Sequence, residues 1–556
     1  MSEVGAGGRS GGSARKKSGR HADNRTDEPT DEPIQERTDE TTRRRTGVRT
    51  GGRAGRQARR ATGAVKAFDR AWREWRNPYP PIEQFSADEI EAIHQAALRV
   101  LSTTGIRVLN DDARRILGAG GMTVAGEIVR FDPELTTSLA ETAPDRIVFS
   151  GMGADRDVMV GGDRIGVGTV GGTPNFSDLD HGRRPGTLAL LNDFLALAQS
   201  FDVIHMIGPL VEPQDVPIHL RHMPMTRSQV ALTEKVPYVY FRGSEVVADS
   251  YEIIRLAKGL TAEEFRARPH TYSVANSNSP LVLDHLMCRG IIDAARARQV
   301  MVLTPFTLAG AMAPVTLAGA LVLQNAEALA GIALSQLASP GAPVIYGSFT
   351  SNVDMKTGSP AFGTPEYVKG AFASGQLARR YRLPLRNSAP NASNVPDAQA
   401  AYETQMSMWG ALMGGVNMLV HAAGWLEGGL TASAEKFIID IEMLQMFAEL
   451  FKPVPSDPDA LATAAIAEVG HGGHFFGTQH TLDRYETAFY SPLLSDWSNF
   501  ENWRDGGSVD SLQRANRIYH ETVRRFEPPR RDPARLEAVD AFIAKRTEEG
   551  GADILV

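Results

Sequence analysis

The middle of the chain alternates between two hydrophobic patterns. Short runs rich in β-branched residues predict strands at 165–170, 203–207, 237–241, 271–275, 300–303, 343–346, 384–386 and 416–420. Between them, apolar residues at helical spacing predict helices, for example at 188–200, 244–258, 281–297, 316–337, 365–381 and 397–413. Eight strands that are each followed by a helix predict an α/β fold of the (β/α)8 or TIM-barrel type over residues 161–452.

An open, doubly wound parallel sheet is the alternative arrangement of the same elements. That fold usually carries a G-x-G-x-x-G phosphate loop after its first strand. The segment after that strand, GTVGGTPNF (168–176), has glycines without this spacing, and the G-x-G-x-x-G match GVGTVG (166–171) begins inside the predicted strand (165–170) rather than after it. The barrel is therefore the favoured prediction.

The regions on either side of the barrel differ from it in composition. Residues 1–62 are rich in Gly, Ser, Thr, Arg and acids and too poor in apolar residues to bury a core, so we expect a disordered polar tail. Residues 63–160 predict an N-terminal α+β cap, with a helix at 86–101 and strands at 106–108 and 128–131. Residues 453–556 predict a C-terminal extension with helices near 511–526 and 534–547.

Charge and cysteine content narrow the class of protein. The net charge of −7 gives no reason to expect nucleic acid as a partner. Cys288 is the single cysteine, which excludes an internal disulfide and fits a cytoplasmic protein. The most apolar stretch, 316–338, contains Gln324, Asn325 and Glu327, so it predicts a core helix rather than a membrane span. The start of the chain has no apolar signal sequence.

Barrel enzymes place their chemistry at the carboxyl ends of the strands. In this chain those positions are rich in amides and aromatic rings, and the candidate substrate-binding residues are Phe176, Asn276, Tyr346, Phe349, Asp354, Asn387, Asn391, His421, Trp425 and Glu427. Aromatic faces attract quaternary ammonium groups by about 0.5–2 kcal/mol per ring, and Asp354 or Glu427 could balance the charge. The alternative is that these rings only close the end of the barrel. No residue is assigned a catalytic role.

Other chemistries have weaker support. His471, His474 and His480 (HGGHFFGTQH) lie in a glycine-rich loop, with no cysteine or nearby acid to complete a ligand set, so we predict no metal site. Residues 63–556 contain no G-x-S-x-G elbow, and the chain contains no P-loop.

Four segments carry a resemblance to a known family. They are PVTLAGALVLQNAEALAGI (314–332), YGSFTSNVDMKTGSPAFGTPE (346–366), VPDAQA (395–400) and TASAEKFIIDI (431–441). The chain resembles the trimethylamine methyltransferase family of corrinoid-dependent methyltransferases over roughly residues 80–530. The resemblance implies a (β/α)8 barrel, an oligomer, and methyl transfer from a methylated amine to the cobalt(I) of a separate corrinoid protein docked over the barrel mouth. Corrinoid carriers have a D-x-H-x-x-G motif, which this chain lacks, so we expect it to bind no corrinoid tightly.

One position departs from the family pattern. Archaeal trimethylamine enzymes of this family carry pyrrolysine just before the V-P-D-x-Q-A motif, and Pro390 stands there in this chain. Proline supplies neither an imine nor an N–H. The resemblance therefore points to the non-pyrrolysine branch, which acts on quaternary amines such as glycine betaine. Such a substrate leaves as a neutral amine and needs no general acid. Arg386 could pair with a betaine carboxylate, or it could be an ordinary barrel-edge arginine.

Two other functions stay open on the sequence. One is a different barrel enzyme, a lyase or a metal-dependent hydrolase, which would contain stoichiometric metal. The other is a non-catalytic betaine-binding protein, which would bind quaternary amines without methylating a corrinoid.

Overall fold

The main sheet contains six parallel strands in the order β10–β12–β14–β17–β18–β7. The computed structural model describes residues 74–554. The strands of this sheet are β7 (Arg164–Val167), β10 (Tyr272–Ala275), β12 (Val300–Leu303), β14 (Val344–Gly347), β17 (Leu385–Ser388) and β18 (Met418–Val420), with β1 (Trp75–Arg76) antiparallel to β7 at its edge. Helices alternate with these strands along the chain, so the fold is mixed α/β.

Single parallel bridges continue the sheet beyond both of its ends. Gly168 pairs with Met206, Met206 with Val236, and Tyr238 with Tyr272 of β10. The strands predicted at 203–207 and 237–241 are thus present as isolated bridges rather than as ladders. In the second segment Pro237 has no N–H to donate, and the N–H and carbonyl of Tyr238 bond to the Gln229 side chain instead of to a neighbouring strand.

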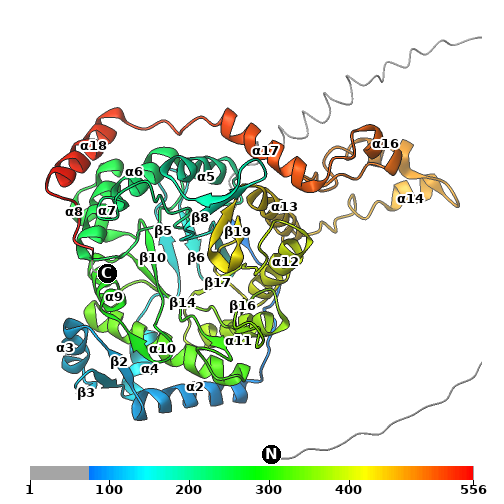
Figure 1. The fold of residues 1–556 in the computed structure, drawn as a ribbon. Coiled ribbons are helices and arrows are strands. Elements are labelled where there is room, and N and C mark those ends of the chain that lie inside the picture. The colour runs from blue at the N-terminus through cyan, green and yellow to red at the C-terminus, as the bar shows by residue number, and fades with distance from the viewer. Residues whose placement is uncertain (1–73, 555–556) are drawn as a thin grey trace, which may run out of the picture. The chain divides into compact units, whose positions relative to one another are not determined.

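Nine helices of the central region follow the sheet strands and bridges in sequence, and Figure 1 shows them arranged around the strands. They are α5 (Leu188–Ser200), α6 (His222–Leu232), α7 (Ser244–Lys258), α8 (Ala262–Ala267), α9 (His285–Ala297), α10 (Leu317–Ala338), α11 (Pro365–Arg380), α12 (Ala398–Met413) and α13 (Ala434–Leu450). Helix α10 is long and apolar enough to cross a membrane, but 78% of its most apolar 18-residue stretch is buried inside the protein. It is a core helix that packs against elements on both sides.

The N-terminal elements pack against α10. Helix α2 (Ala87–Thr103) begins with a capping box in which Ser86 and Glu89 satisfy each other's backbone N–H groups. The other elements of this region are β2 (Ile106–Val108), α3 (Asp111–Ala119), β3 (Thr123–Ala125), β4 (Ile128–Arg130), α4 (Pro133–Glu141), β5 (Ile147–Phe149) and β6 (Val158–Val160). This region thus contains both helices and short strands, and its definition as a separate cap stays a prediction.

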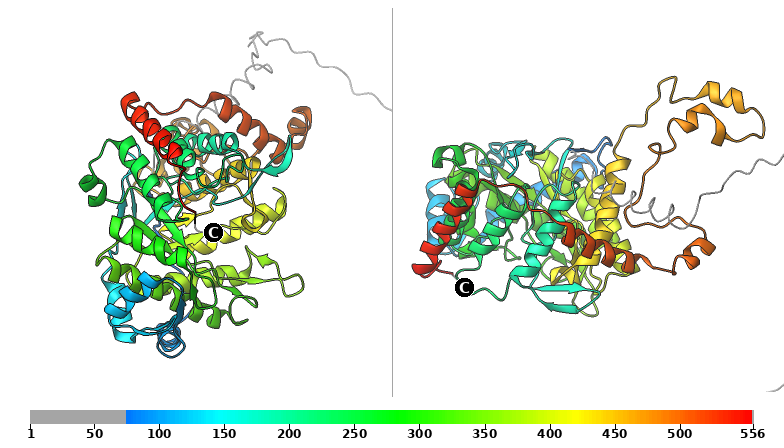
Figure 2. Two further views of the ribbon diagram at one scale, coloured as in Figure 1. Left: turned by 60° about the vertical axis from the view of Figure 1, so that its left-hand side comes forward. Right: turned by 90° about the horizontal axis from the view of Figure 1, so that it is seen from above.

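Short strands follow the carboxyl ends of several strands of the main sheet. Further helices follow α13 in the sequence. The strands are β8 (Asn175–Asp178), β9 (Gly182–Pro185), β11 (Val282–Leu283), β13 (Leu308–Ala309), β15 (Ser351–Val353), β16 (Pro360–Ala361), β19 (Trp425–Leu426) and β20 (Thr431–Ser433). The later helices are α14 (Thr463–Val469), η2 (Phe475–Gly477), α15 (Gln479–Leu482), α16 (Phe500–Asp505), α17 (Ser511–Arg525) and α18 (Pro533–Glu548), and Figure 2 shows them from two further sides. The polar tail predicted for 1–62 lies outside the described residues, and the other predicted domain boundaries stay predictions.

A buried ion pair on α13 fastens the segment that follows β18. Lys436 and Asp440 are both fully buried and paired with each other. Lys436 also donates to the Thr404 hydroxyl on α12 at 2.9 Å, and Asp440 accepts from the backbone N–H of Gly424 at 2.8 Å. Since Gly424 lies beside Trp425, the pair fixes the backbone that carries this tryptophan.

Removal of one partner should therefore be costly. In Asp440→Ala the ammonium of Lys436 stays buried without its counter-charge, and we expect the free energy of unfolding to fall by about 3–5 kcal/mol. Glu127→Ala is the matched control, because the pair between Glu127 and Arg107 is exposed and worth less than about 1 kcal/mol. Urea denaturation at neutral pH measures both. If the free energy of unfolding fell equally in the two variants, the buried pair would stabilise the fold no more than the exposed pair does.

Candidate active site

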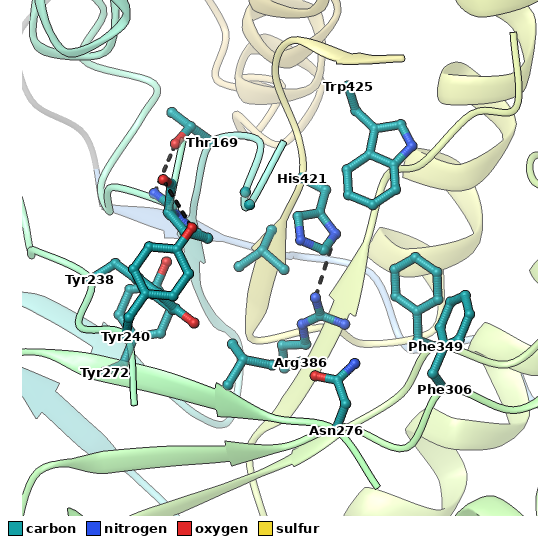
Figure 3. A pocket seen from close by; sticks show the side chains of 16 residues that line it. Thr169, Tyr238, Tyr240, Tyr272, Asn276, Phe306, Phe349, Arg386, His421 and Trp425 are labelled. Carbon is teal, nitrogen blue, oxygen red and sulfur yellow. Dashed lines mark hydrogen bonds between the residues drawn. The ribbon is translucent and has the colours of Figure 1, made fainter. Parts of the chain in front are cut away.

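A cavity of about 240 Å³ opens at the carboxyl ends of the parallel strands. This volume is below the about 300–1,000 Å³ that is typical of ligand pockets. The cavity therefore fits a small ligand. Figure 3 shows its side chains. It is lined by Thr169, Gly171, Gly172, Gly208, Pro209, Tyr238, Tyr240, Tyr272, Val274, Asn276, Phe306, Phe349, Arg386, Val420, His421 and Trp425.

One side of the cavity is a tyrosine wall formed by Tyr238, Tyr240 and Tyr272. The ring centroid of Tyr238 lies 5.1 Å from that of Tyr240 and 5.2 Å from that of Tyr272. The Tyr272 hydroxyl donates to the carbonyl of Ile207 at 2.8 Å. Burial raises the pKa of Tyr238 to about 12, so this phenol stays protonated at neutral pH. The wall is thus uncharged and rich in π-electron density.

The opposite side is a Phe–Trp wall formed by Phe306, Phe349, His421 and Trp425 (Figure 3). The centroids of Phe306 and Phe349 are 5.0 Å apart, and those of His421 and Trp425 are 4.3 Å apart. Asn391 anchors this wall, because its backbone carbonyl accepts from Trp425 Nε1 at 3.0 Å and its amide donates to the Trp425 carbonyl at 2.6 Å.

Arg386 on β17 lies between the two walls and is buried (Figure 3). Its Nη1 donates to the Ser348 carbonyl at 3.2 Å, and its Cζ lies 5.5 Å from the ring centroid of Phe349. Within the part of the chain that the structure describes, its Nε has no hydrogen-bond partner. Among residues 74–554 no carboxylate forms an ion pair with Arg386. Burial lowers the pKa of Arg386 to about 10, which still leaves it charged at neutral pH.

His421 is held as a neutral acceptor beside this charge. Its Nδ1 lies 3.0 Å from Ser388 Oγ and 3.5 Å from Arg386 Nη2. The guanidinium can only donate, so Nδ1 accepts and the ring proton is on Nε2. Burial, and then the charge of Arg386, lower the pKa of His421 well below its usual value. His421 has a φ of 54°, and its backbone N–H donates to the Thr169 carbonyl at 3.1 Å, which joins β18 to the end of β7.

The structure brings five of the twelve residues predicted from the sequence to this cavity. They are Asn276, Phe349, Arg386, His421 and Trp425. The other seven do not line it: Phe176, Tyr346, Asp354, Asn387, Pro390, Asn391 and Glu427.

Each of those seven has other contacts. The Tyr346 hydroxyl donates to Asn325 Oδ1 and accepts from Gln324 Nε2 on α10, and the side-chain oxygen Oδ1 of Asn387 accepts from the Tyr367 hydroxyl. Three lie on loops or strands beyond the cavity: Phe176 under the Arg184 guanidinium, Asp354 in an exposed turn with Thr357, and Glu427 in an ion pair with Arg183. Pro390 is buried, and its backbone carbonyl accepts from the Ser407 hydroxyl. The side-chain amide of Asn391 donates to the backbone carbonyl of Trp425.

Sequence reasoning missed Thr169, the tyrosine wall and Phe306. A signal for two tyrosines was available in the run PYVYFR (237–242), because alternate residues of an extended segment face the same side, here Tyr238 and Tyr240. Tyr272 lies within β10 rather than after it, so a search of strand ends passes over it.

A metal centre has little support among residues 74–554. The group there whose ligand atoms lie within 4.8 Å of one another is Asp178, Asp180 and His181. Arg184 already pairs with Asp178, and His520 with Asp180. The three histidines of the 471–480 loop form no such group in this part of the chain.

Comparison with known proteins gives the same family over nearly the whole chain. The sequence model for trimethylamine methyltransferase (MTTB) matches residues 49–551. A glycine betaine methyltransferase of Desulfitobacterium hafniense (strain Y51) is 34% identical over 476 residues, which cover 85% of this chain and 99% of the relative. A trimethylamine methyltransferase MttB of D. hafniense (strain DSM 10664 / DCB-2) is 30% identical, covering 84% of this chain and 94% of the relative.

Matches also come from archaea and from solved structures. The trimethylamine methyltransferase MttB2 of Methanosarcina mazei is 29% identical over 83% of this chain and 94% of its own. The crystal structure of the Methanosarcina barkeri monomethylamine methyltransferase MtmB gives a TM-score of 0.43 at 11% identity, covering 85% of this chain and 93% of that one. On the extent of the family match and the identity to its members, this chain belongs to the trimethylamine methyltransferase family.

Proposed function

We propose that the protein transfers a methyl group from a betaine, a quaternary ammonium that carries a carboxylate, to the cobalt(I) of a corrinoid on a separate protein in the cytoplasm. We also infer that the six parallel strands, with the segments around Met206 and Val236–Tyr238, close into a (β/α)8 barrel. The three parallel bridges at Gly168–Met206, Met206–Val236 and Tyr238–Tyr272 support this closure.

The proposed substrate class is inferred from the charge of Arg386, which no carboxylate among residues 74–554 pairs with. A simple cation such as trimethylammonium or choline would face a second buried positive charge, which is unfavourable at short distance in a cavity of low polarity. A betaine brings a carboxylate that can accept from the guanidinium, and its trimethylammonium head can then lie against aromatic faces. The identity to a glycine betaine methyltransferase agrees with this reading.

The proposed binding residues follow from the same geometry. Arg386 holds the carboxylate, with Asn276 beside it in the cavity (Figure 3). The tyrosine wall and the Phe–Trp wall enclose the ammonium head. Asn391 and Ser388 act indirectly, by positioning Trp425 and His421.

The proposed reaction needs no proton transfer in the cavity. The bond between nitrogen and one methyl carbon breaks with its electron pair left on nitrogen, while the methyl carbon takes an electron pair from cobalt(I). The amine leaves neutral, so no general acid is required. The task of this chain is to exclude water and to align the N–CH₃ bond with the opening of the cavity.

The lining residues leave room for the methyl acceptor to approach. Gly171, Gly172 and Gly208 line the cavity without side chains. Gly172 has a φ of 70°, and a Cβ placed there would meet only the Tyr240 hydroxyl, at 3.8 Å. Gly171 and Gly208 are packed, because a Cβ there would lie 2.5 Å from Pro209 Cδ and 2.4 Å from the Val170 carbonyl oxygen. We infer that a flat corrinoid carried by a partner protein reaches the methyl group on the side of Gly172.

The deciding experiment mixes the full chain with a free cobalt(I) corrinoid and one methylated amine at a time, and follows the absorbance of methylcobalt. We expect methylation with glycine betaine and little with trimethylamine or choline. The opposite preference would overturn the proposed substrate. Betaine binding without methyl transfer would favour a binding protein, and stoichiometric metal in the purified chain would favour a hydrolase.

Substitution of Arg386 tests the carboxylate contact. In Arg386→Gln the loss of charge-assisted hydrogen bonds, worth about 1.5–3 kcal/mol, should weaken glycine betaine binding by about ten- to a hundred-fold. Choline should bind equally or better, because a repelling charge is gone. Titration calorimetry measures both ligands, with Arg183→Gln, which lies outside the cavity, as the control. A parallel loss for choline and betaine would contradict the assignment.

Betaine binding should not change with pH across the neutral range. The pKa of His421 lies well below its usual value, and the pKa values of Arg386 and Tyr238 are about 10 and about 12. Arg386 is a base with a lowered pKa, so it stays charged below that value and loses its charge above it. The dissociation constant should be flat from pH about 6 to about 9 and should rise only above about 10. A change in the dissociation constant near pH 7 would instead show that betaine binding depends on a group with an ordinary histidine pKa.

A further inference from the structure

The segment between α13 and α17 is an arm with little burial of its own. We define the arm as residues 453–510, in which only Ala465, Thr478 and Leu494 are buried. Its helices α14, α15 and α16 have 7, 4 and 6 residues, too short to be stable without packing. Figures 1 and 2 show α14 and α16 projecting beyond α13, whereas α17 returns to pack against α13 and α5.

The arm presents large apolar side chains to solvent. Phe476, Phe489 and Trp497 are 83%, 86% and 72% exposed, and Phe475, Tyr485 and Phe500 are exposed as well. An aromatic side chain buries about 150–250 Å² when it is covered. These six rings are therefore enough for an interface of about 800 Å² per partner. Soluble monomers rarely expose so much apolar surface in one segment.

A second exposed apolar surface lies on the body of the protein, at the root of the arm. We call it the body patch, and it contains Tyr402, Met406 and Trp409 on α12 with Met446 and Leu450 on α13. The three α12 residues are spaced i, i+4 and i+7, so they lie along one face. The ring of Trp409 packs against Phe447, the neighbour of Met446, at 4.8 Å, which makes the patch continuous across both helices.

We propose that the arm of one subunit packs on the body patch of a second copy of this chain. Both surfaces are apolar, both belong to the same chain, and both are uncovered in a single copy. In a two-fold dimer each arm meets the partner's patch, so one kind of contact is formed twice and neither surface is left exposed. This inference rests on exposure and packing alone and does not depend on the proposed methyl transfer.

Charged substitutions on each surface test the contact. The arm variant Phe476→Asp/Phe489→Asp and the patch variant Tyr402→Glu/Met406→Glu should each convert a wild-type oligomer to monomers in size-exclusion chromatography with light scattering. Val315→Asp is the control, because Val315 is 71% exposed but lies on neither surface. Circular dichroism and betaine binding should be unchanged in all three variants. A monomeric wild type, or variants that remain oligomeric, would overturn the proposal.

Mixing the variants identifies the partner of the arm. An arm variant and a patch variant together can form one contact in which both surfaces are intact, so the mixture should regain dimers. Two arm variants cannot. Cys288 is the single cysteine and is buried, so cysteines introduced as Phe489→Cys and Tyr402→Cys on separate chains should form an intersubunit disulfide under mild oxidation. Failure of both rescue and cross-linking, with the single variants monomeric, would show that the arm does not meet the patch.

Discussion

The guanidinium of Arg386 lies in a cavity lined by aromatic rings, and residues 74–554 supply no carboxylate to pair with it. This unpaired charge constrains the protonation of neighbouring side chains and the charge of the ligand that can bind. Arg386 has the Ser348 carbonyl, the His421 ring and the face of Phe349 as its partners. These groups spread the charge but do not neutralise it. The charge of Arg386 favours a neutral His421, and on the proposed function the carboxylate of the bound ligand supplies the missing negative charge. On the proposed chemistry the ammonium loses its own charge as the C–N bond breaks, so its repulsion by Arg386 eases toward the transition state.

The two walls of the cavity are supported in different ways. Hydrogen bonds from Asn391 hold Trp425, and Asn391 in turn donates to Thr404, which also accepts from buried Lys436. The Phe–Trp wall is therefore tied to α12 and α13 by a connected polar network. The tyrosine wall rests on aromatic packing and on bonds to the backbone carbonyls of Ile207 and Pro209.

Hydrophobic periodicity was sufficient for most elements of the fold. Helices α5 and α7 begin and end where their patterns predict, because their apolar stripes end at clear boundaries. The segments 203–207 and 237–241 have strand-like composition but form only bridges, and in the second segment Pro237 lacks a donor while the Gln229 side chain binds both backbone groups of Tyr238. Strand propensity describes the preference of each residue by itself. It does not include the hydrogen bonds that neighbouring segments can form with that residue.

The site was predictable in position and only partly in residues. Phe349, His421 and Trp425 follow their strands and do line the cavity. Tyr346 and Asn387 are in or next to the same strand ends but face helices, because successive residues of a strand point to opposite sides. The register that decides between the two sides is set by packing across the whole sheet, which a local pattern does not contain. Tyr272 was missed because it lies at the start of β10 rather than after its end.

The single bridges beneath the tyrosine wall have one more consequence. Backbone held by isolated pairs opens locally at lower free energy than backbone in a continuous ladder, and its amide protons exchange with water sooner. Val236 bonds to the backbone of His205 and Ile207, and the N–H and carbonyl of Tyr238 bond to the Gln229 side chain rather than to a ladder, whereas Arg386 is on a strand paired on both sides. On the proposed function, the backbone around Tyr238, which has few ladder bonds, surrounds the apolar surface of the ligand, and the continuous sheet carries the charged residue. Relatives could diverge in the size of the amine they accept by remodelling the tyrosine side, while the charged anchor keeps its place.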